Sequence, residues 1–578
     1  MKKLAVLLLL LVFLCSLVGC AAKTPQTTTP PQSTTATSPA TTTEPFVLEN
    51  LTLKILVAND ASWHDFRELN KYNVWKPFAQ LCADRKLTIE WIVVEKEQYT
   101  ATLMDYLVGN PAEMPDAFWC SEDVLPAEQR LQLVNNGKLY PLEDILPHSD
   151  GTASSWYENH PNIQRAKGYH GKTWWVSSYL ETVWNGEALQ PGQCLPKGVV
   201  FRLDWYNLLV QLGAWDASRG YPDTAQELGE FLELCNVYDV NGDNSRNEYY
   251  LSYISDLHST GLGNLFGVPR NAFAPNLVTG TVDTAWTQPG SRELMELLID
   301  WNSKGYFPED LIGGSSGSTK YRTRNQTAVY NTYFCDNWGM HNTSVQEGAA
   351  PAVLCGVLPD LTVHPNAYIA TDSPVTMDET SLCFTSNLSH PAAAAALLDL
   401  MCSSEFAHLL QWGTEGDTFE YVDGKEVLLP TGSDLSYSES IKMRYKVTGK
   451  DLFSYYVLPD VRELYDIREY ELLCYPENSH DSSGEMHRVF IEALTQWTPT
   501  YPDQIDSFLA VATPEETMLL SLFEPIFQEL SKEIFFDLIT GKISMNQWDD
   551  CIQRLNEEGH MAQIQAVYQA RYDRYLGK

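Results

Sequence analysis

The stretch that decides the fold is Leu51-Thr52-Leu53-Lys54-Ile55-Leu56-Val57, in which apolar residues recur at every second position and predict a β-strand. Helical and alternating apolar patterns then take turns as far as Gly137. The helical patterns cover Val74–Cys82, Tyr99–Leu107 and Arg130–Asn136, and the alternating ones cover Leu87–Val93 and Asp116–Cys120. This β-α-β-α-β-α order predicts an α/β fold with a sheet of parallel strands and helices on both faces.

The N-terminus has the features of a secretory signal. Lys2 and Lys3 precede an apolar run that is shorter than the roughly 20 residues needed to span a bilayer, so residues 1–19 are predicted to be a signal peptide. Leu17-Val18-Gly19-Cys20 resembles the lipobox of bacterial lipoproteins, which implies that Cys20 is acylated. The alternative is an ordinary cleavage site beside a chance cysteine. Residues 20–46 are rich in Thr and Pro and are predicted to be an extended tether. No later apolar run approaches the length of a membrane span.

The composition is acidic, with a formal net charge of −36. Removal of residues 1–19 leaves 37 basic against 75 acidic side chains, a net charge of −38. Nucleic acid and anionic lipid are therefore poor partners, because both attract basic surfaces. The 16 Trp and 30 Tyr residues are mostly expected in the core, and such an excess also suits a sugar pocket. Of the 12 Cys, ten remain after Cys15 and Cys20, and they form no C-x-x-C pair. We expect buried thiols, with one or two disulfides as the alternative.

Five short motifs occur in the order found in one protein family. They are Asn136–Leu142, Gly171–Val176, Phe201–Trp205, Trp412–Gly416 followed by Val422–Lys425, and Leu538–Lys542 followed by Trp548–Asp550. Together they resemble bacterial extracellular solute-binding proteins of ABC transporters, family 1, which is related to maltose-binding protein, and within it the branch of larger lipoproteins. The resemblance implies a two-lobed periplasmic-binding-protein-like fold of type II, with three chain crossings at a hinge and extra C-terminal helices.

On this resemblance, lobe 1 comprises residues 47–180 and 330–380, and lobe 2 comprises residues 187–326 and 386–578. The three crossings are expected near residues 177–187, 325–332 and 378–386. A solute would be bound between the lobes, which would close around it.

Candidate ligand contacts follow from position. Ligands of parallel α/β sheets bind outside the carboxyl ends of the strands. The candidates follow strand ends or lie on a crossing, and they are Trp63, Trp119, Glu122, Asp123, Trp175, Tyr179, Glu181, Asp336 and Trp338. In the resembled family the equivalent positions supply aromatic platforms and carboxylates for sugar hydroxyls. For each residue, the alternative is a place in the core or on the surface.

A polar loop carries oxygen-bearing side chains at alternate positions. They belong to Asp239, Asn241, Asp243, Ser245, Asn247 and, one residue later, Glu248. The pattern resembles a calcium loop, although the sixth and twelfth positions, Gly and Glu in an EF-hand, are Asn244 and Tyr250 here. Calcium would then be structural, and no other cofactor is expected. A solvated Asx-rich turn is the alternative.

The function implied is that of a lipid-anchored receptor on the extracytoplasmic face of the membrane, which delivers an oligosaccharide to ABC permease subunits. A surface glycan-binding or sensory lipoprotein without a transporter is the alternative. A secreted glycosidase is disfavoured, because no spacing of carboxyls points to two acids across one pocket. Gly313–Gly317 matches a nucleophile-elbow pattern but lacks the flanking apolar strand and helix.

Overall fold

The computed structural model describes residues 51–59, 65–109, 113–120, 124–177, 179–181, 196–252, 254–308, 318–334, 352–371, 375–377, 381–428, 500–503 and 505–578, with the single positions 489 and 492. Residues from Leu48 to the C-terminus form one compact unit. The predicted signal peptide, Cys20 and the tether up to residue 46 lie outside the described residues.

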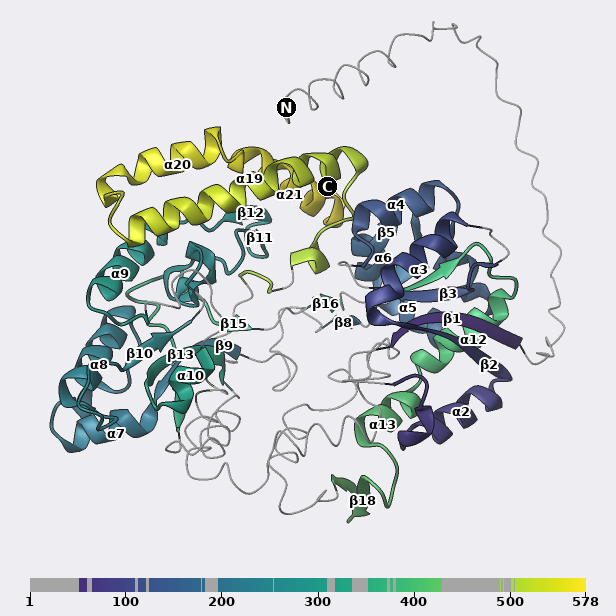
Figure 1. Ribbon diagram of the computed structural model, residues 1–578, viewed down its shortest axis with the longest axis horizontal. Coiled ribbons are helices and arrows are strands. Elements are labelled where there is room, and N and C mark those ends of the chain that lie inside the picture. The colour runs from purple at the N-terminus through teal and green to yellow at the C-terminus, as the bar shows by residue number, and fades with distance from the viewer. Residues whose placement is uncertain are drawn as a thin grey trace, which may run out of the picture. The chain divides into compact units, whose positions relative to one another are not determined.

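Lobe 1 is an α/β layer structure with helices on both faces of its sheet (Figure 1). Its main strands are β1 (Leu51–Asn59), β2 (Leu87–Glu95), β3 (Ala117–Cys120), β4 (Leu139–Tyr140), β7 (Trp175–Val176) and β17 (Ser381–Thr385). Its helices are α2 (Trp75–Asp84), α3 (Lys96–Val108), α4 (Ala127–Asn135), α5 (Thr152–Asn159), α6 (Pro161–Lys167), α12 (Pro391–Met401) and α13 (Ser404–Trp412). Short hairpins add β5 (Gly168–Tyr169) with β6 (Lys172–Thr173), and β18 (Phe419–Val422) with β19 (Lys425–Leu428).

The sheet of lobe 1 has the order β2-β1-β3-β17-β4, and β7 also pairs with β17. β1 is parallel to both β2 and β3, which confirms the predicted parallel arrangement. The side chains of β1 alternate between two cores, as a period of two requires. Leu53, Ile55 and Val57 pack with α2, α12 and α13, whereas Leu56 packs with α3 and α4. The alternating apolar pattern of Leu51–Val57 therefore belongs to a strand inside the sheet, and helices cover both of its faces.

Lobe 2 is built on a second sheet, with the order β10-β13-β9-β14 and with β15 paired to β9. These strands are β9 (Pro196–Arg202), β10 (Tyr249–Leu251), β13 (Thr327–Tyr333), β14 (Leu354–Gly356) and β15 (Ala370–Thr371). The surrounding elements are α7 (Leu203–Gln211), η5 (Ala217–Arg219), α8 (Ala225–Tyr238), η6 (Leu257–Thr260), η7 (Gly263–Phe266), β11 (Phe273–Asn276), β12 (Thr281–Thr284), α9 (Ser291–Ser303) and α10 (Ser318–Thr323).

The predicted lobe boundaries need two corrections. Residues 330–380 were assigned to lobe 1, but β13, β14 and β15 all pair with β9 in the sheet of lobe 2. Residues from 386 onward were assigned to lobe 2, but α12 and α13 pack in the core of lobe 1. An apolar strand pattern shows that a segment is buried in a sheet, but it does not show in which sheet.

Two short strands connect the lobes. β8 (Tyr179–Glu181) follows β7 of lobe 1 and precedes β9 of lobe 2, and β16 (Val375–Met377) follows β15 of lobe 2 and precedes β17 of lobe 1. The two are paired antiparallel, with Glu181 opposite Val375. They lie at or beside the predicted crossings at 177–187 and 378–386. The crossing predicted at 325–332 is wrong, because this segment from Thr327 onward belongs to β13, which pairs with β9 in the sheet of lobe 2.

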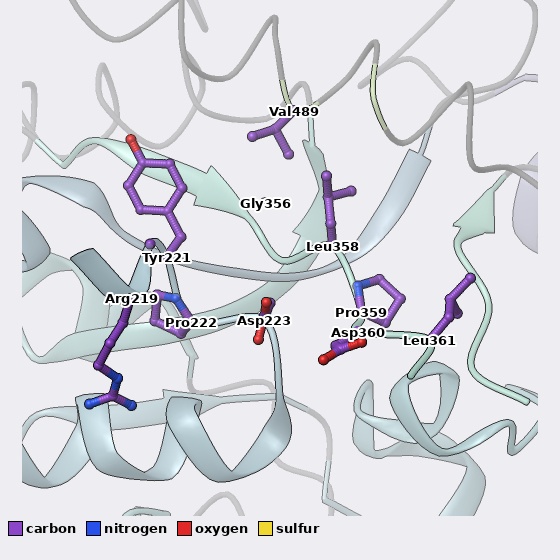
Figure 2. A pocket seen from close by; sticks show the side chains of 11 residues that line it. Arg219, Tyr221, Pro222, Asp223, Gly356, Leu358, Pro359, Asp360, Leu361 and Val489 are labelled. Atoms are coloured by element: carbon purple, nitrogen blue, oxygen red, sulfur yellow. The ribbon is translucent and has the colours of Figure 1, made fainter. Parts of the chain in front are cut away.

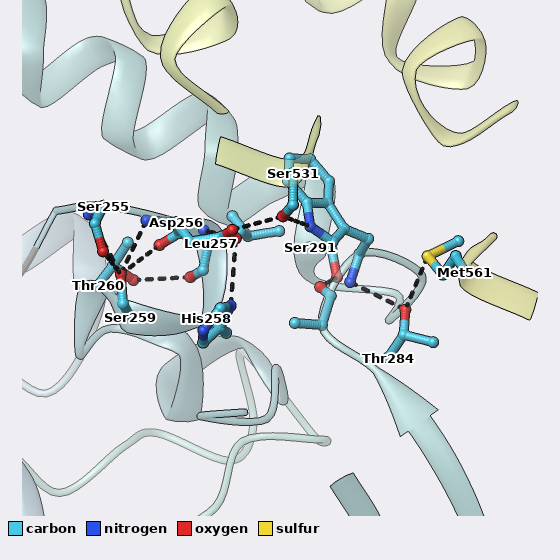
Figure 3. A network of polar contacts seen from close by, with 12 residues as sticks. Ser255, Asp256, Leu257, His258, Ser259, Thr260, Thr284, Ser291, Ser531 and Met561 are labelled. Atoms are coloured by element: carbon cyan, nitrogen blue, oxygen red, sulfur yellow. Dashed lines mark hydrogen bonds and ion pairs between the residues drawn. The ribbon is translucent and has the colours of Figure 1, made fainter. Parts of the chain in front are cut away.

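The predicted extra C-terminal helices are present in the described part of the chain. They are α19 (Pro514–Ile539), α20 (Trp548–Glu557) and α21 (Met561–Tyr575), preceded by the short helices η11 (Ile505–Phe508) and η12 (Met545–Gln547), and they pack into the core of lobe 2. A buried polar chain fastens α19 to that lobe (Figure 3): the indole of Trp286 donates to Ser531 over 2.8 Å, and Ser531 donates to Asp256 over 2.5 Å. Asp256 also caps η6.

Two further predictions concern membrane spans and thiols. Among the described residues, no single helix is long and apolar enough to cross a membrane; only α12 with the first part of α13 meets those criteria together, across a bend of 58°. Cys82, Cys235 and Cys551 are buried free thiols, which agrees with the expected structural cysteines at these three positions. Burial raises the pKa of the Cys82 thiol to about 12, so this thiol is protonated at neutral pH.

Candidate functional site

The carboxyl ends of the parallel strands of lobe 1 lie at the edge where the chain crosses to lobe 2. Ser381, the first residue of β17 after the crossing, pairs with Cys120 at the end of β3. Val176, the last residue of β7 before the other crossing, pairs with Leu382. Both described crossing strands therefore meet lobe 1 at the edge where ligands of such sheets bind.

A buried polar group joins the two crossing strands at this edge. The hydroxyls of Ser177 and Ser381 lie 2.8 Å apart. The guanidinium of Arg130, on α4, donates to Ser381 over 3.3 Å and to the carbonyl of Leu125 over 2.8 Å, and it lies over the ring of Trp175. Only 1% of Arg130 is exposed. Arg130 thus ties α4 to the base of both crossing strands.

Two predicted ligand contacts are buried in this edge. Trp119 lies in β3 and is 7% exposed, and its carbonyl accepts a hydrogen bond from Tyr99. Trp175 lies in β7 and is 3% exposed. Both indoles belong to the cores of lobe 1, so in this structure they pack rather than form an open aromatic wall.

The other predicted contacts are placed only in part. Tyr179 and Glu181 are both on β8, the crossing strand that pairs with β16. Asp336 and Trp338 follow β13, whose end at Tyr333 pairs with Lys197 at the start of β9. Trp63, Glu122, Asp123, Asp336 and Trp338 themselves lie outside the described residues.

A cavity of about 450 Å³ lies in lobe 2 (Figure 2). Its walls come from the loop between α7 and α8, from the segment after β14, and from Val489. The chain after β14 runs toward the start of β9, since Val357 donates to the carbonyl of Val199. The cavity therefore lies beside β9, the first strand of lobe 2 after the crossing strand β8.

The cavity combines apolar walls with carboxylates. Tyr221, Pro222, Leu358, Pro359 and Leu361 provide apolar surface, and Asp223 and Asp360 provide the acids. The amide of Asp360 donates to the carbonyl of Asp223 over 3.2 Å, which holds the two loops together. Partial burial and the neighbouring carboxylates of Glu227 and Asp360 raise the pKa of Asp223 to about 6. Hydrogen bonds from Thr362 hold the pKa of Asp360 below its usual value.

The sequence did not predict this cavity. The hydroxyl of Thr224, next to Asp223, caps α8 by accepting from the amide of Glu227. Asp223 and Asp360 come from distant parts of the chain, so no local motif links them. The usable signal was that Asp223 comes shortly before a helix and Asp360 comes shortly after a buried strand.

The predicted calcium loop is a compact polar turn between α8 and β10. The carboxylate of Asp239 accepts from the amides of Asp243 and Asn244, at 3.1 and 3.0 Å. The amide side chain of Asn247 donates to Asp243 over 2.6 Å, and that of Asn241 donates to Asn247 over 2.8 Å. The amide of Ser245 donates to Asp243 over 2.9 Å. The six predicted ligands therefore belong to one connected loop.

Two features of this loop bear on metal binding. Asn244, at the position where an EF-hand has Gly, has φ of +62°, a left-handed conformation that Asn tolerates better than most residues. Glu248 is fully buried, and its Oε1 atom has no hydrogen-bond partner. Burial raises the pKa of this carboxyl. Among the described residues, however, no three His, Cys, Asp or Glu side chains are arranged to hold a metal.

Comparison with known proteins gives structural relatives. No protein-family model matches the chain, and no curated protein matches it. An extracellular solute-binding protein from Bifidobacterium longum subsp. infantis has a TM-score of 0.65 at 16% identity, over 91% of this chain and 98% of that one. The S. pneumoniae ABC-transporter substrate-binding protein FusA, in complex with kestose, has a TM-score of 0.62 at 16% identity, over 91% and 100% of the two chains. FusA has also been solved as an EF-hand mutant.

A third solved structure is the alginate-binding protein AlgQ2 without calcium ion, with a TM-score of 0.59 at 14% identity, over 91% of this chain and 98% of AlgQ2. The likeness therefore covers nearly the full length of each relative. The chain has the two-lobed α/β fold of extracellular solute-binding proteins, which confirms the predicted fold class.

Proposed function

We propose that the chain is the lipid-anchored, extracytoplasmic solute-binding component of an ABC importer, and that it binds an oligosaccharide between its lobes without chemically changing it. Cys20 carries the lipid, residues 20–46 are the tether, and permease subunits receive the solute. Lobe 1 binds the ligand at the edge where β8 and β16 attach, and lobe 2 binds it at the cavity beside Asp223 and Asp360.

This proposal rests on one observation, namely that a chain with the fold of solute-binding proteins also contains a cavity of suitable size. The relatives with this fold include a kestose-binding protein and an alginate-binding protein. In this chain, the described cavity of about 450 Å³ lies in lobe 2 beside the sheet that contains β9, and it has the size and the mixture of apolar walls and polar groups of a small-molecule site. Tyr179 and Glu181 stay proposed contacts because β8 is one of those crossing strands.

The direct test is a binding screen with the purified full chain. Mono- and oligosaccharides, peptides and amino acids are compared by thermal shift, and hits are measured by calorimetry. We expect an oligosaccharide to bind with a Kd in the micromolar range or below, and to be recovered intact after long incubation. Binding of peptides alone would contradict the proposed ligand class, and loss of the oligosaccharide with appearance of shorter sugars would indicate a glycosidase.

Coupling to transport needs its own test, because a sensory or glycan-binding surface lipoprotein would also bind a sugar. Deletion of the encoding gene should abolish uptake of the labelled oligosaccharide by the native cells. Normal uptake in the deletion strain would favour the alternative without a transporter.

The lipid anchor is tested by labelling. Cells that express the chain are fed radiolabelled palmitate, and the membrane fraction is examined. The native chain should carry the label and stay with the membranes, whereas Cys20→Ala should carry none. A labelled Cys20→Ala variant would show that the lipid is elsewhere.

We further propose that the loop of Asp239, Asn241, Asp243, Ser245, Asn247 and Glu248 binds calcium with a structural role. The oxygen donors are of the kind that calcium prefers, and a cation would compensate the buried carboxylate of Glu248, whose Oε1 atom has no partner. Among the structural relatives, AlgQ2 has been solved without calcium ion and FusA has been solved as an EF-hand mutant.

Calcium should raise the melting temperature of the native chain relative to EGTA, since a ligand that binds only the folded state stabilises it. The variant Glu248→Gln tests the role of the buried carboxylate in calcium binding. Without calcium it should be at least as stable as the native chain, because it removes a buried charge, and added calcium should then stabilise it less than it stabilises the native chain. Exposed Asp549→Asn is the control and should respond to calcium like the native chain. Equal melting temperatures of the native chain in calcium and EGTA would reject the site.

A further inference from the structure

Among the described residues that line the cavity of lobe 2, Arg219 is the one cation, and it is already paired. Arg219 lines the cavity wall, but its guanidinium donates to Glu230 over 2.8 and 2.7 Å and to Glu227 over 2.9 Å. It also lies over the ring of Trp215, 4.4 Å from the ring centre. Figure 2 shows its side chain pointing away from the two acids. Arg219 therefore has little capacity left to receive a carboxylate from a ligand.

The two acids of the cavity have no such compensation. Asp360 accepts from the amide and the hydroxyl of Thr362, at 2.7 and 2.6 Å, and both are neutral donors. Asp223 faces the carboxylates of Glu227 and Asp360. Among the ion pairs of the described residues, none joins a Lys or Arg side chain to Asp223 or Asp360. The cavity therefore carries net negative charge beside apolar walls.

We propose that this cavity selects amine-bearing or neutral oligosaccharides and rejects those that carry carboxylates, with Asp223 and Asp360 as the residues that set the preference. This inference rests on the proposed sugar-binding function. A ligand amine would be attracted by both carboxylates, and sugar hydroxyls can donate hydrogen bonds to them. A ligand carboxylate would instead meet two like charges, and Arg219, the arginine among the described lining residues, is already paired with Glu227 and Glu230.

The overall charge of the protein acts in the same direction. The chain carries 75 acidic and 39 basic side chains, so its mean field repels anionic solutes. At physiological ionic strength this long-range field is screened beyond about 8 Å. The preference should therefore depend mainly on the two acids in the cavity, which makes it testable by substitution.

The test uses the full chain at pH 7.5 and a glycan panel in which each backbone occurs in three forms: with a free amine, with an acetylated amine, and with a carboxylate. Binding is measured by calorimetry. We expect the carboxylate form to bind about tenfold or more weakly than the neutral form of the same backbone. The difference should shrink at high salt, because the charges are screened.

The double variant Asp223→Asn with Asp360→Asn keeps the shape and removes both charges. Because sugar hydroxyls also bind these two residues, the readout is a ratio: the affinity for the carboxylate form divided by the affinity for the neutral form of the same backbone should rise about tenfold relative to the native chain. Asp216→Asn is the matched control: it removes an acid from the same loop, outside the cavity wall, where the side chain caps η5. A melting temperature for each variant verifies that it is folded.

Three experimental outcomes would contradict this proposal or a part of it. Equal affinity of the native chain for carboxylate and neutral forms overturns the proposal but leaves sugar binding intact. An unchanged preference in the double variant overturns the assignment to Asp223 and Asp360. Failure of every glycan to bind contradicts the proposed function itself, and this inference falls with it.

Discussion

Asp399 is a buried acid that holds two separate parts of lobe 1 together. It lies on α12 and is 3% exposed. Its carboxylate accepts from the hydroxyl of Ser149 over 2.5 Å and from the amides of Asp150 and Ala153 over 2.9 Å each. These amides belong to the start of α5, so Asp399 supplies the cap that α5 lacks from its own N-cap residue.

We predict that Asp399→Ala lowers the free energy of unfolding by about 3 kcal/mol, because it leaves the buried amide of Ala153 and the partly buried donors of Ser149 and Asp150 without their acceptor. Urea unfolding followed by tryptophan fluorescence measures the change. The control is Asp105→Ala, since Asp105 is exposed on α3 and Ala favours the helix. A loss below about 0.5 kcal/mol in Asp399→Ala would show that water replaces the carboxylate.

The titration of Asp223 should make the stability of the protein depend on pH. Partial burial, Glu227 and Asp360 raise its pKa from 3.8 to about 6. Between these two values the folded state binds the proton more tightly than the unfolded state does. This carboxyl therefore lowers stability as pH rises through 6, and the loss is absent below about pH 4.

Asp223→Asn removes this titration. Relative to the native chain, its melting temperature should rise as the pH increases from about 4 to 6 and should level off above that. Asp216→Asn should differ from the native chain by a constant amount above about pH 5, because hydrogen bonds from Ser218 lower the pKa of Asp216 and this carboxyl is then ionised in both the folded and the unfolded state. A difference between Asp223→Asn and the native chain that stays constant over this range would argue against the raised pKa.

At the scale of elements, α19 begins with a reciprocal cap. The hydroxyl of Thr513 accepts from the amide of Glu516 over 3.2 Å, and Glu516 accepts from the amide of Thr513 over 2.9 Å. Arg574 on α21 then donates to both carboxylate oxygens of Glu516, at 2.7 and 2.6 Å. The start of α19 is therefore also a contact between two C-terminal helices.

Thr513→Ala should cost about 1 kcal/mol of stability, the usual effect of removing a side-chain cap. Thr513→Ser keeps the hydroxyl and should restore most of the loss. Chemical denaturation of both variants gives the comparison. Equal stability of the alanine and serine variants would mean that the hydroxyl does not matter here.

Elements were predictable from the sequence where the signal was local. The strands at Leu51–Val57 and Leu87–Val93 and the helix at Tyr99–Leu107 follow from the period of their apolar residues. The lobe assignment of β13 was not predictable in this way, because its apolar residues would suit either sheet. The cavity was not predictable for the same reason, because only the tertiary structure brings Asp223 and Asp360 together.

At the scale of the whole molecule, the paired strands β8 and β16 are the described connection between the lobes. Their three paired positions join Tyr179–Glu181 to Val375–Met377. The Ser177, Ser381 and Arg130 contacts fix this ribbon to lobe 1. Bending is therefore expected on the lobe 2 side of the ribbon, because the lobe 1 side is held in a buried, hydrogen-bonded base.

If a solute is captured by closure, binding must change the distance between the lobes. Val108 is 78% exposed at the end of α3 in lobe 1, and Val278 is 66% exposed in the turn between β11 and β12 of lobe 2. Fluorophores on genetically encoded residues at these two positions avoid the native cysteines. Saturation with the tightest-binding glycan of the panel should shift the transfer efficiency of this pair. A second pair, at Leu212 and Val278, lies within lobe 2 and should not respond. An unchanged interlobe signal at saturation, with binding confirmed by calorimetry, would mean that the sugar binds to lobes that do not move.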